Sequence, residues 1–193
     1  IMMALIVFVV GTALFLAREI GRRAEAEDRL EELATTDALT GLRNRRKFDH
    51  AIDAEWRRAA RNNTPVAVLM IDADHFKAYN DANGHLAGDD ILRRIGAELR
   101  GSIRNDTLAA RYGGEEFIVL MPETGLNEAC QVAERVRRSV ADSPIEDDAV
   151  TVTATLSIGV AEIDEKSNNV DQLIIYADQA LYSAKAAGRN RVM

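Results

Sequence analysis

The sequence Gly113-Gly114-Glu115-Glu116 places two adjacent carboxylates between two apolar runs, 107–112 and 118–121. This pattern predicts a β-hairpin with both glutamates at its turn. Paired glycines permit positive φ in a tight turn and let a large polyanion approach the backbone. The residue types and their spacing therefore suit metal and phosphate chemistry.

A third carboxylate, Asp72, comes directly after the apolar run 66–71, which predicts a buried strand. If this strand and the hairpin are neighbours in one sheet, Asp72 and Glu115 converge at its end. Together they could hold Mg²⁺, a hard cation that prefers carboxylates, water and phosphate oxygens. Mn²⁺ has similar ligand preferences and is the alternative metal.

The composition fits one well-packed domain with an appendage at one end, because 47% of the 193 residues are hydrophobic and 28% are charged. A net charge of −7 argues against nucleic acid as a partner, since that binding depends on clustered Lys and Arg. A nucleotide bound through metal ions remains compatible with it. The single cysteine, Cys130, lies in an apolar helical pattern and is expected to be a buried structural thiol without a disulfide partner.

The first 17 residues carry no charge and are followed by Arg18, Arg22 and Arg23. Residues 1–17 are therefore predicted to be the end of a transmembrane helix, with the following domain on the cytoplasmic side of the inner membrane. An apolar helix buried in an oligomer and a signal peptide are the alternatives. Residues 18–36 are charged and favour helix, which fits either a coiled-coil stalk or a plain solvated helix.

The remaining residues, 37–193, are predicted to form one domain that begins at the turn residues 37–42. Helices are predicted over 45–61, 90–103, 126–140 and 170–187, with a short helix after Asp72, a polar loop over 80–89 and a β run over 150–161. The expected fold class is α+β, with a central, mainly antiparallel sheet flanked by helices and preceded by a long N-terminal helix.

Five separated motifs resemble those of the GGDEF family of diguanylate cyclases, in the family's order. They are DALTGLRNRR at 37–46, DADHFK at 72–77, NDANGHLAGD at 80–89, RYGGEEF at 111–117 and ALYSAKAAGRN at 180–190. The resemblance implies a fold similar to the palm of nucleotidyl cyclases and polymerases. It also implies that two GTP molecules condense to cyclic di-GMP and two pyrophosphates.

The resemblance assigns the metal to Asp72 and Glu115, with the backbone carbonyl of Ala73 as a further ligand. Such a metal would lower the pKa of the attacking 3′-hydroxyl and neutralise charge on the phosphate oxygens. Either Glu115 or Glu116 would accept the proton or add a ligand, and the sequence leaves that choice open. Without the other motifs, the two glutamates would be solvated residues of a surface turn.

The resemblance assigns guanine recognition to Asn80 and Asp89, and it places His85 beside the nucleoside. Guanine presents N1–H and a 2-amino group side by side, whereas adenine lacks both donors, so these acceptors favour GTP over ATP. Local pattern offers simpler roles: a helix N-cap for Asp89, a turn residue for Asn80 and a packed side chain for His85.

Phosphate neutralisation, which is a binding and a catalytic role, is assigned to Lys77 and to the backbone amides of His75 and Phe76. Lys185 and Arg189 match the family's triphosphate-binding pair; otherwise they are ordinary cations near the C-terminus of a helix. Asn44 and Arg45 match a motif that braces the start of the domain, and a structural role is expected for them.

The chain departs from the family's inhibitory product site, Arg-x-x-Asp, because Thr107 occupies the Asp position after Arg104. A hydroxyl cannot replace the charge-assisted acceptor that a carboxylate provides, although Asp106 could substitute after a one-residue shift. Arg58 and Arg135 are the expected companions of Arg104 in this degenerate site. Weak or absent inhibition by cyclic di-GMP is expected.

One site holds one GTP, so the product requires two domains face to face, which implies a two-fold homodimer. Helix pairing in the stalk would then control whether the half-sites meet. A catalytically inactive module that senses GTP or cyclic di-GMP is the alternative function. A mixed adenine–guanine product conflicts with Asp89.

Overall fold

The computed structural model describes residue 19 and residues 34–104, 106–143, 145–147, 150–163 and 169–193. The predicted membrane segment and most of the predicted stalk lie outside these residues. The described fold is the compact unit Thr36–Met193. Within the described part of the chain, no helix is long and apolar enough to cross a membrane.

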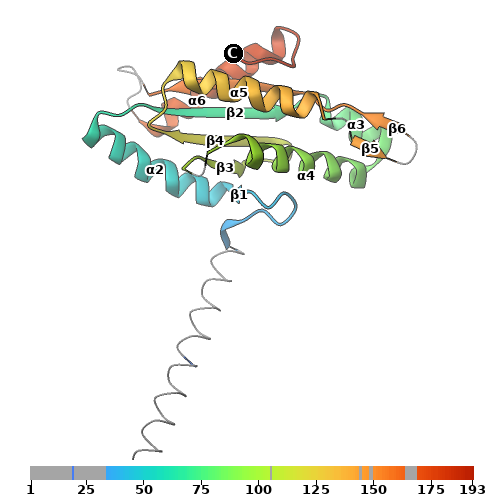
Figure 1. Ribbon diagram of the computed structural model, residues 1–193, viewed down its shortest axis with the longest axis horizontal. Helices are drawn as coiled ribbons and strands as arrows, with labels where there is room; N and C mark the ends of the chain where they lie inside the picture. Colours follow the sequence, from blue (N-terminus) through green and yellow to red (C-terminus); the bar gives the residue numbers. More distant parts are fainter. Residues whose placement is uncertain (1–18, 20–33, 105, 144, 148–149, 164–168) are drawn as a thin grey trace, which may run out of the picture. The chain divides into compact units, whose positions relative to one another are not determined.

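The centre of this unit is a five-stranded sheet in the order β1-β3-β4-β2-β7 (Figure 1). Its strands are β1 (Arg43–Asn44), β2 (Val66–Ala73), β3 (Leu108–Arg111), β4 (Glu116–Pro122) and β7 (Leu156–Glu162). Only the β1–β3 pair is parallel, and the other three neighbouring pairs are antiparallel. The predicted α+β class with a mainly antiparallel sheet is confirmed.

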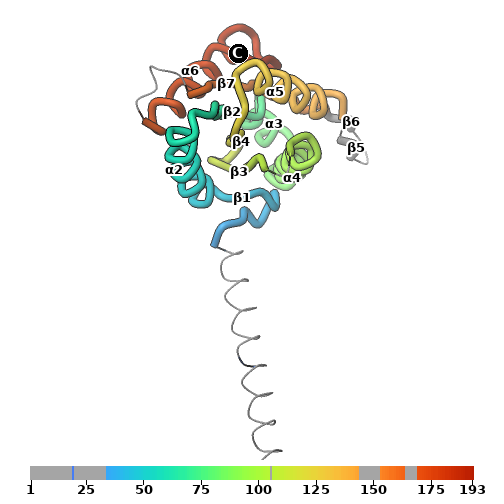
Figure 2. The backbone as a smooth tube through the Cα atoms, turned by 60° about the vertical axis from the view of Figure 1, so that its left-hand side comes forward, coloured from blue at the N-terminus to red at the C-terminus, as the bar shows by residue number. Residues whose placement is uncertain are grey.

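Five helices are complete within the described residues: α2 (Arg45–Asn62), α3 (Phe76–Asn83), α4 (His85–Ser102), α5 (Leu126–Ala141) and α6 (Val170–Ala186). Figure 2 shows α2 and α6 on one side of the strands and α4 and α5 on the other. Asn44 caps α2 by accepting a hydrogen bond from the backbone N–H of Lys47, which supports the structural role expected for Asn44.

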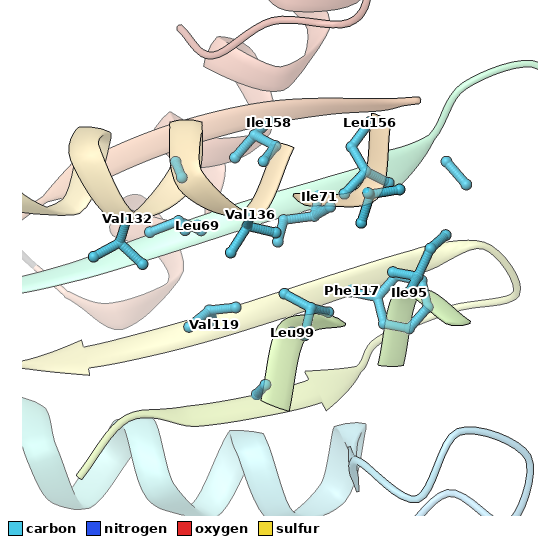
Figure 3. Packing of buried hydrophobic residues seen from close by; sticks show 14 of the residues in the cluster. Leu69, Ile71, Ile95, Leu99, Phe117, Val119, Val132, Val136, Leu156 and Ile158 are labelled. Carbon is cyan, nitrogen blue, oxygen red and sulfur yellow. The ribbon is translucent and has the colours of Figure 1, made fainter. Parts of the chain in front are cut away.

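Strand β2, which carries Asp72 next to its last residue, is the middle of the core, since all eight of its residues are buried. Its side chains alternate between the two faces, as a strand requires. Leu69 and Ile71 pack with α4 and α5 (Figure 3), whereas Val68 and Met70 pack with α2 and α6. Burial on both faces explains why this strand is a continuous apolar run in the sequence.

The polar loop predicted over 80–89 is wrong, because α3 continues to Asn83 and α4 begins at His85 with only Gly84 between them. Gly84 makes this junction with φ of 85°, a left-handed value that favours glycine. The polar residues of this stretch cover a solvent-facing helical surface. The polarity of these residues indicated that they are exposed to solvent, but it did not indicate whether their backbone is helical or irregular.

The predicted β run over 150–161 is divided in the structure. It contains β6 (Val150–Val152) and all of β7 except its last residue, and β6 pairs with β5 (Ile145–Asp147) in a separate two-stranded sheet. Strand β1 was not predicted, because two residues are too few to give an alternating pattern.

Candidate active site

The acidic residues predicted to converge come together at one end of the sheet. In the antiparallel β2–β4 pair, Asp72 lies opposite Glu116, and the backbone N–H of Ala73 donates to the carbonyl of Glu115 over 3.2 Å. The hairpin turn is therefore tied to the end of β2. The predicted proximity of Asp72 and Glu115 follows from this register.

The two carboxylates also interact electrostatically. Burial raises the pKa of Glu115, and the negative charges of Asp72 and Glu116 raise it further, against the opposite effect of Lys185. Burial likewise raises the pKa of Asp72, with Asp74 adding to the increase and Lys185 and Arg189 opposing it. A bound cation would relieve this crowding of negative charge.

A lysine from α6 provides a partial counter-charge. Lys185 Nζ lies 2.8 Å from Asp72 Oδ2, in a pair whose carboxylate is buried. The structure therefore joins Lys185 to the predicted metal ligand itself. This contact is more specific than the helix-dipole role that local pattern alone would give Lys185.

The donor set fits a hard divalent cation. It consists of two carboxylates, Asp72 and Glu115, and the carbonyl of Ala73. No group of three or more His, Cys, Asp or Glu side chains that could hold a metal occurs among the described residues. A small set of oxygen ligands that leaves positions for substrate phosphates is typical of Mg²⁺.

The two glutamates of the hairpin differ in their surroundings. Glu115 interacts with Asp72 and Lys185, whereas the carboxylate of Glu116 lies against Gly113, where a Cβ atom would overlap it. Neither Gly113 nor Gly114 has positive φ, so the turn does not use the left-handed conformation that glycine permits. The missing Cβ of Gly113 leaves room for the Glu116 carboxylate, and Glu115 is the better placed of the two to act with Asp72.

The residues expected to recognise guanine lie inside helices and not in a loop. Asn80 is on α3 and Asp89 is in the second turn of α4, so neither the turn role nor the N-cap role applies. Asn80 Oδ1 is buried without a hydrogen-bond partner in the described structure. His85, the first residue of α4, is exposed, which excludes the packed role considered for it.

Cationic and amide groups for phosphate come from two elements. Lys77 is exposed on α3, whose N-cap residue His75 has φ of 58° and makes no side-chain capping bond. Phe76, the first residue of α3, is buried. Arg189 follows α6 with φ of 62°, and its charge acts on Asp72. These positions bring the predicted phosphate-binding groups toward the same end of the sheet.

Two further residues support the hairpin and were not singled out from the sequence. Arg111 donates to the carbonyl of Gly114 over 2.7 Å and lies 3.3 Å from Asp37. Burial alone would raise the pKa of Asp37, but hydrogen bonds from Thr40 and the charge of Arg111 lower it. Both residues stood within quoted motifs, but their partners are 74 residues apart in the chain.

Arg45 also contacts the hairpin, since its guanidinium lies 4.4 Å from the centre of the Tyr112 ring. This cation–π contact joins the start of α2 to the residue before Gly113. It supports the bracing role expected for Arg45.

The predicted inhibitory site is only partly assembled. Arg104 and Arg135 line one cavity of about 200 Å³ with Thr107, but Arg58 does not line it and pairs with Glu123 at 2.6 Å. Arg104 is already engaged by the Thr124 hydroxyl at 3.0 Å, by Glu128 at 3.1 Å and by Asp106 at 3.4 Å. Arg135 donates to the carbonyl of Ser102.

The thiol expected to be buried is only half-buried. Cys130 lies on α5 and packs against the edge of the core, and burial raises the pKa of its thiol. A raised pKa keeps the thiol protonated and inert. This agrees with a structural role.

The fold and the acid pair define a palm-like nucleotidyl cyclase domain, and the comparisons identify its family. Residues 34–191 match the family model described as diguanylate cyclase, GGDEF domain. The chain belongs to this GGDEF family.

Known relatives and solved structures agree with this assignment. Response regulator PleD of Caulobacter vibrioides is 43% identical over 164 residues, which cover 84% of this chain and 36% of PleD. The coiled coil and GGDEF domain of DgcB from Caulobacter crescentus, solved with c-di-GMP, matches with a TM-score of 0.86 at 31% identity, covering 92% of this chain and 94% of that one. The active GGEEF domain of a diguanylate cyclase from Vibrio cholerae matches with a TM-score of 0.74 at 34% identity, covering 77% of this chain and 94% of that one.

Proposed function

We propose that this chain condenses two GTP molecules into cyclic di-GMP and two pyrophosphates, with Mg²⁺ or Mn²⁺ as the metal. The observation that carries the proposal is the convergence of Asp72 and Glu115 at the end of β2, where the Ala73–Glu115 backbone bond ties the hairpin to the strand. Burial raises the pKa of both carboxyl groups, and the charge of Asp72 raises that of Glu115 further. Burial of one carboxylate beside another is unfavourable unless a cation joins them.

In the proposed reaction, the 3′-oxygen of one GTP bonds to the α-phosphorus of the other, and the bond from that phosphorus to pyrophosphate breaks. A metal held by Asp72, Glu115 and the Ala73 carbonyl would lower the pKa of the hydroxyl and neutralise phosphate charge. Glu115 or Glu116 accepts the hydroxyl proton. The phosphates are bound by the side chains of Lys77, Lys185 and Arg189 and by the backbone amides of His75 and Phe76.

Selection of guanine is assigned to Asn80 and Asp89. The buried Asn80 Oδ1 without a partner supports this, because a buried acceptor is costly until a donor reaches it. The guanine N1–H or 2-amino group supplies such a donor, whereas adenine offers neither. His85, exposed at the start of α4, lies beside the nucleoside in this proposal.

Each domain has one acid pair and would bind one GTP, whereas the product is made from two. We therefore propose a two-fold homodimer in which each domain supplies one of the two nucleotides. Pairing of the stalk, residues 18–36, would bring the domains together, and residues 1–17 would anchor them in the inner membrane with the catalytic domain in the cytoplasm. The basic residues after the apolar segment support this orientation. Both segments lie outside the described residues.

A catalytically inactive module that senses GTP or cyclic di-GMP is the second candidate. It is disfavoured because every acidic, guanine-binding and phosphate-binding residue that the family's motifs call for is present. The same Gly-Gly-Glu-Glu-Phe sequence characterises the active Vibrio cholerae domain.

The test is incubation of the purified protein with GTP and Mg²⁺, followed by identification of the product. We expect cyclic di-GMP and two pyrophosphates per product from the unmodified chain, and a loss of at least about 100-fold in Glu115→Ala. Glu123→Gln, which changes an exposed glutamate away from the acid pair, is the matched control. Binding of GTP without any product would favour the sensor, and a mixed product would contradict the role of Asp89.

A further inference from the structure

The turn that follows α6 has an unusual backbone conformation. Gly188, Arg189 and Asn190 have consecutive φ values of 112°, 62° and 46°. Residues other than glycine adopt the left-handed region at a cost, so such a turn persists only where its surroundings hold it. Arg189 belongs to this turn, and it is one of the two cations that the proposed function assigns to the triphosphate.

The carboxylate of Asp74, which is distant from this turn in the sequence, holds the turn by a hydrogen bond. Asp74 Oδ2 accepts a hydrogen bond from the backbone N–H of Asn190 over 3.0 Å, although the two residues are 116 positions apart. This bond fixes the backbone directly after Arg189. A charged acceptor makes it stronger than a bond between neutral groups.

Asp74 is itself fixed by the beginning of β7 and the residue before it. Its Oδ2 also accepts from the Thr155 hydroxyl over 2.8 Å, its Oδ1 accepts from the Ser157 hydroxyl over 2.6 Å, and its N–H donates to the Thr155 carbonyl over 2.9 Å. Three donors therefore occupy the carboxylate: the hydroxyls of Thr155 and Ser157, which orient it, and the Asn190 N–H of the turn. Asp74 is therefore committed to hydrogen bonds and is not placed as a further metal ligand.

The outer side of the turn has its own contacts. Arg137 of α5 donates to the side chain of Asn190 over 2.5 Å, and Arg191 donates to the carbonyl of Arg189 over 3.0 Å. These contacts do not reach the end of β2. Among the hydrogen bonds of the described residues, the one to Asp74, two residues after Asp72, links the backbone of the turn to the end of β2.

We propose that Asp74 is a positioning residue for the triphosphate: it holds the left-handed turn so that Arg189 stays beside the end of β2. The proposal rests on the proposed function, since it supposes that Arg189 contacts phosphate. It assigns Asp74 no contact with the substrate. Its effect on binding passes through Arg189.

The test compares the binding of two ligands to the whole 193-residue chain. One is 3′-deoxy-GTP, which keeps the triphosphate but lacks the attacking hydroxyl, and the other is guanosine, which has no phosphate. In Asp74→Asn, the side chain keeps its shape, but its neutral amide is a weaker acceptor for the Asn190 N–H. We expect the affinity for 3′-deoxy-GTP to fall about tenfold and the affinity for guanosine to stay the same.

A double-mutant cycle identifies the route of the effect. Arg189→Ala alone should also weaken 3′-deoxy-GTP binding, and adding Asp74→Asn to it should cause no further loss. Asp81→Asn, which changes an exposed aspartate on α3, is the matched control and should bind both ligands as the unmodified chain does. Thr155→Val, which removes a donor to the same Oδ2, serves if Asp74→Asn does not fold, and it should cause a smaller loss of the same kind.

The outcomes separate this inference from the proposed function. Unchanged 3′-deoxy-GTP affinity in Asp74→Asn, an equal loss for guanosine, or an additive loss with Arg189→Ala would each overturn the positioning role. If the unmodified protein binds no 3′-deoxy-GTP with Mg²⁺ present, the proposed function itself fails. If it binds and the cycle is additive, only the role of Asp74 is wrong.

Discussion

At the scale of single residues, the candidate base-binding site depends on a glycine. Gly88 is a buried residue in the first turn of α4. A Cβ atom there would overlap Asn80 Oδ1 and lie 3.1 Å from the ring of Phe76. The overlapping atom is the end of a side chain, so it can move without disturbing the backbone. Gly88 therefore permits the orientation of Asn80.

We predict that Gly88→Ala weakens GTP binding while the fold persists. Alanine favours helix by about 1 kcal/mol over glycine, which offsets part of the crowding, but Asn80 must rotate away. The KM for GTP, measured from turnover kinetics, should rise about tenfold. The thermal unfolding midpoint of the same variant checks that the fold persists. Gly101→Ala in the same helix, where a Cβ atom meets nothing within 4 Å, is the control. An unchanged KM in Gly88→Ala would contradict the role of Asn80.

At the scale of elements, the position of α6 on the sheet is set by Gly159 of β7. A Cβ atom there would overlap the carbonyl oxygen of Ala177 and the backbone nitrogen of Leu181. Both are backbone atoms, so a larger residue must displace the helix. Because α6 carries Lys185, the close contact also positions the counter-charge of Asp72.

We predict that Gly159→Ala destabilises the protein by about 1–3 kcal/mol, the usual range for overpacking a core. Urea unfolding should show the loss. Activity of the remaining folded protein should also fall, because Lys185 moves from Asp72. Gly101→Ala is again the matched control and should not destabilise. Full stability of Gly159→Ala would mean that α6 can shift at no cost.

The cavity beside α5 that Arg104, Thr107 and Arg135 line permits a prediction about product inhibition. Thr107 lacks the carboxylate of the family's motif, and its hydroxyl is buried without a hydrogen-bond partner in the described part of the chain. Arg104 is also held by Glu128. We predict that cyclic di-GMP inhibits turnover weakly and that Thr107→Asp strengthens the inhibition. Inhibition curves would decide this, and strong inhibition abolished by Arg104→Ala would refute the prediction.

Helix α5 contains an ion-pair network that gives a pH dependence. Hydrogen bonds from Arg137 lower the pKa of Glu134 from 4.5 to about 2; burial opposes this change, and Arg138 contributes to it. The unfolded chain therefore binds more protons than the folded one between these values. The stabilisation is complete above pH 4.5 and is lost as the pH falls toward 2.

We predict that Glu134→Gln lowers the free energy of unfolding at pH 6 by about 1 kcal/mol or less, because water screens this half-exposed network. The difference from the unmodified protein should shrink as the pH falls from 4.5 toward 2. Urea unfolding at several pH values measures it. A difference that grows in acid would contradict the sign of the pKa change.

At the scale of the whole molecule, the described domain holds one acid pair, whereas the proposed product contains two nucleotides. Association of two domains is then a condition for activity, and the stalk is the segment that could control it. Insertion of one to four residues near Glu27, outside the described residues, should change activity with a period of about 3.6 residues. Turnover should be measured with gel filtration of each variant. Equal activity across the series would argue against control by the stalk.

The class of fold and most of the elements were predictable from local patterns of residues. The continuous apolar run before Asp72 gave the central strand, and the apolar spacing of α2, α5 and α6 gave those helices nearly to their ends. These patterns also indicated which residue types are available for metal, base and phosphate, because the motifs are local. Such features depend on nearest neighbours along the chain.

How these residues meet became visible in the folded chain. The register of β2 and β4 brought Asp72 and Glu115 together, α6 brought Lys185 to Asp72, and Asp74 reached Asn190 across 116 positions. The structure also distinguished Glu115 from Glu116 and replaced a loop by the helices that carry Asn80 and Asp89. Contacts between distant segments depend on packing and strand pairing, which no local pattern of residues encodes.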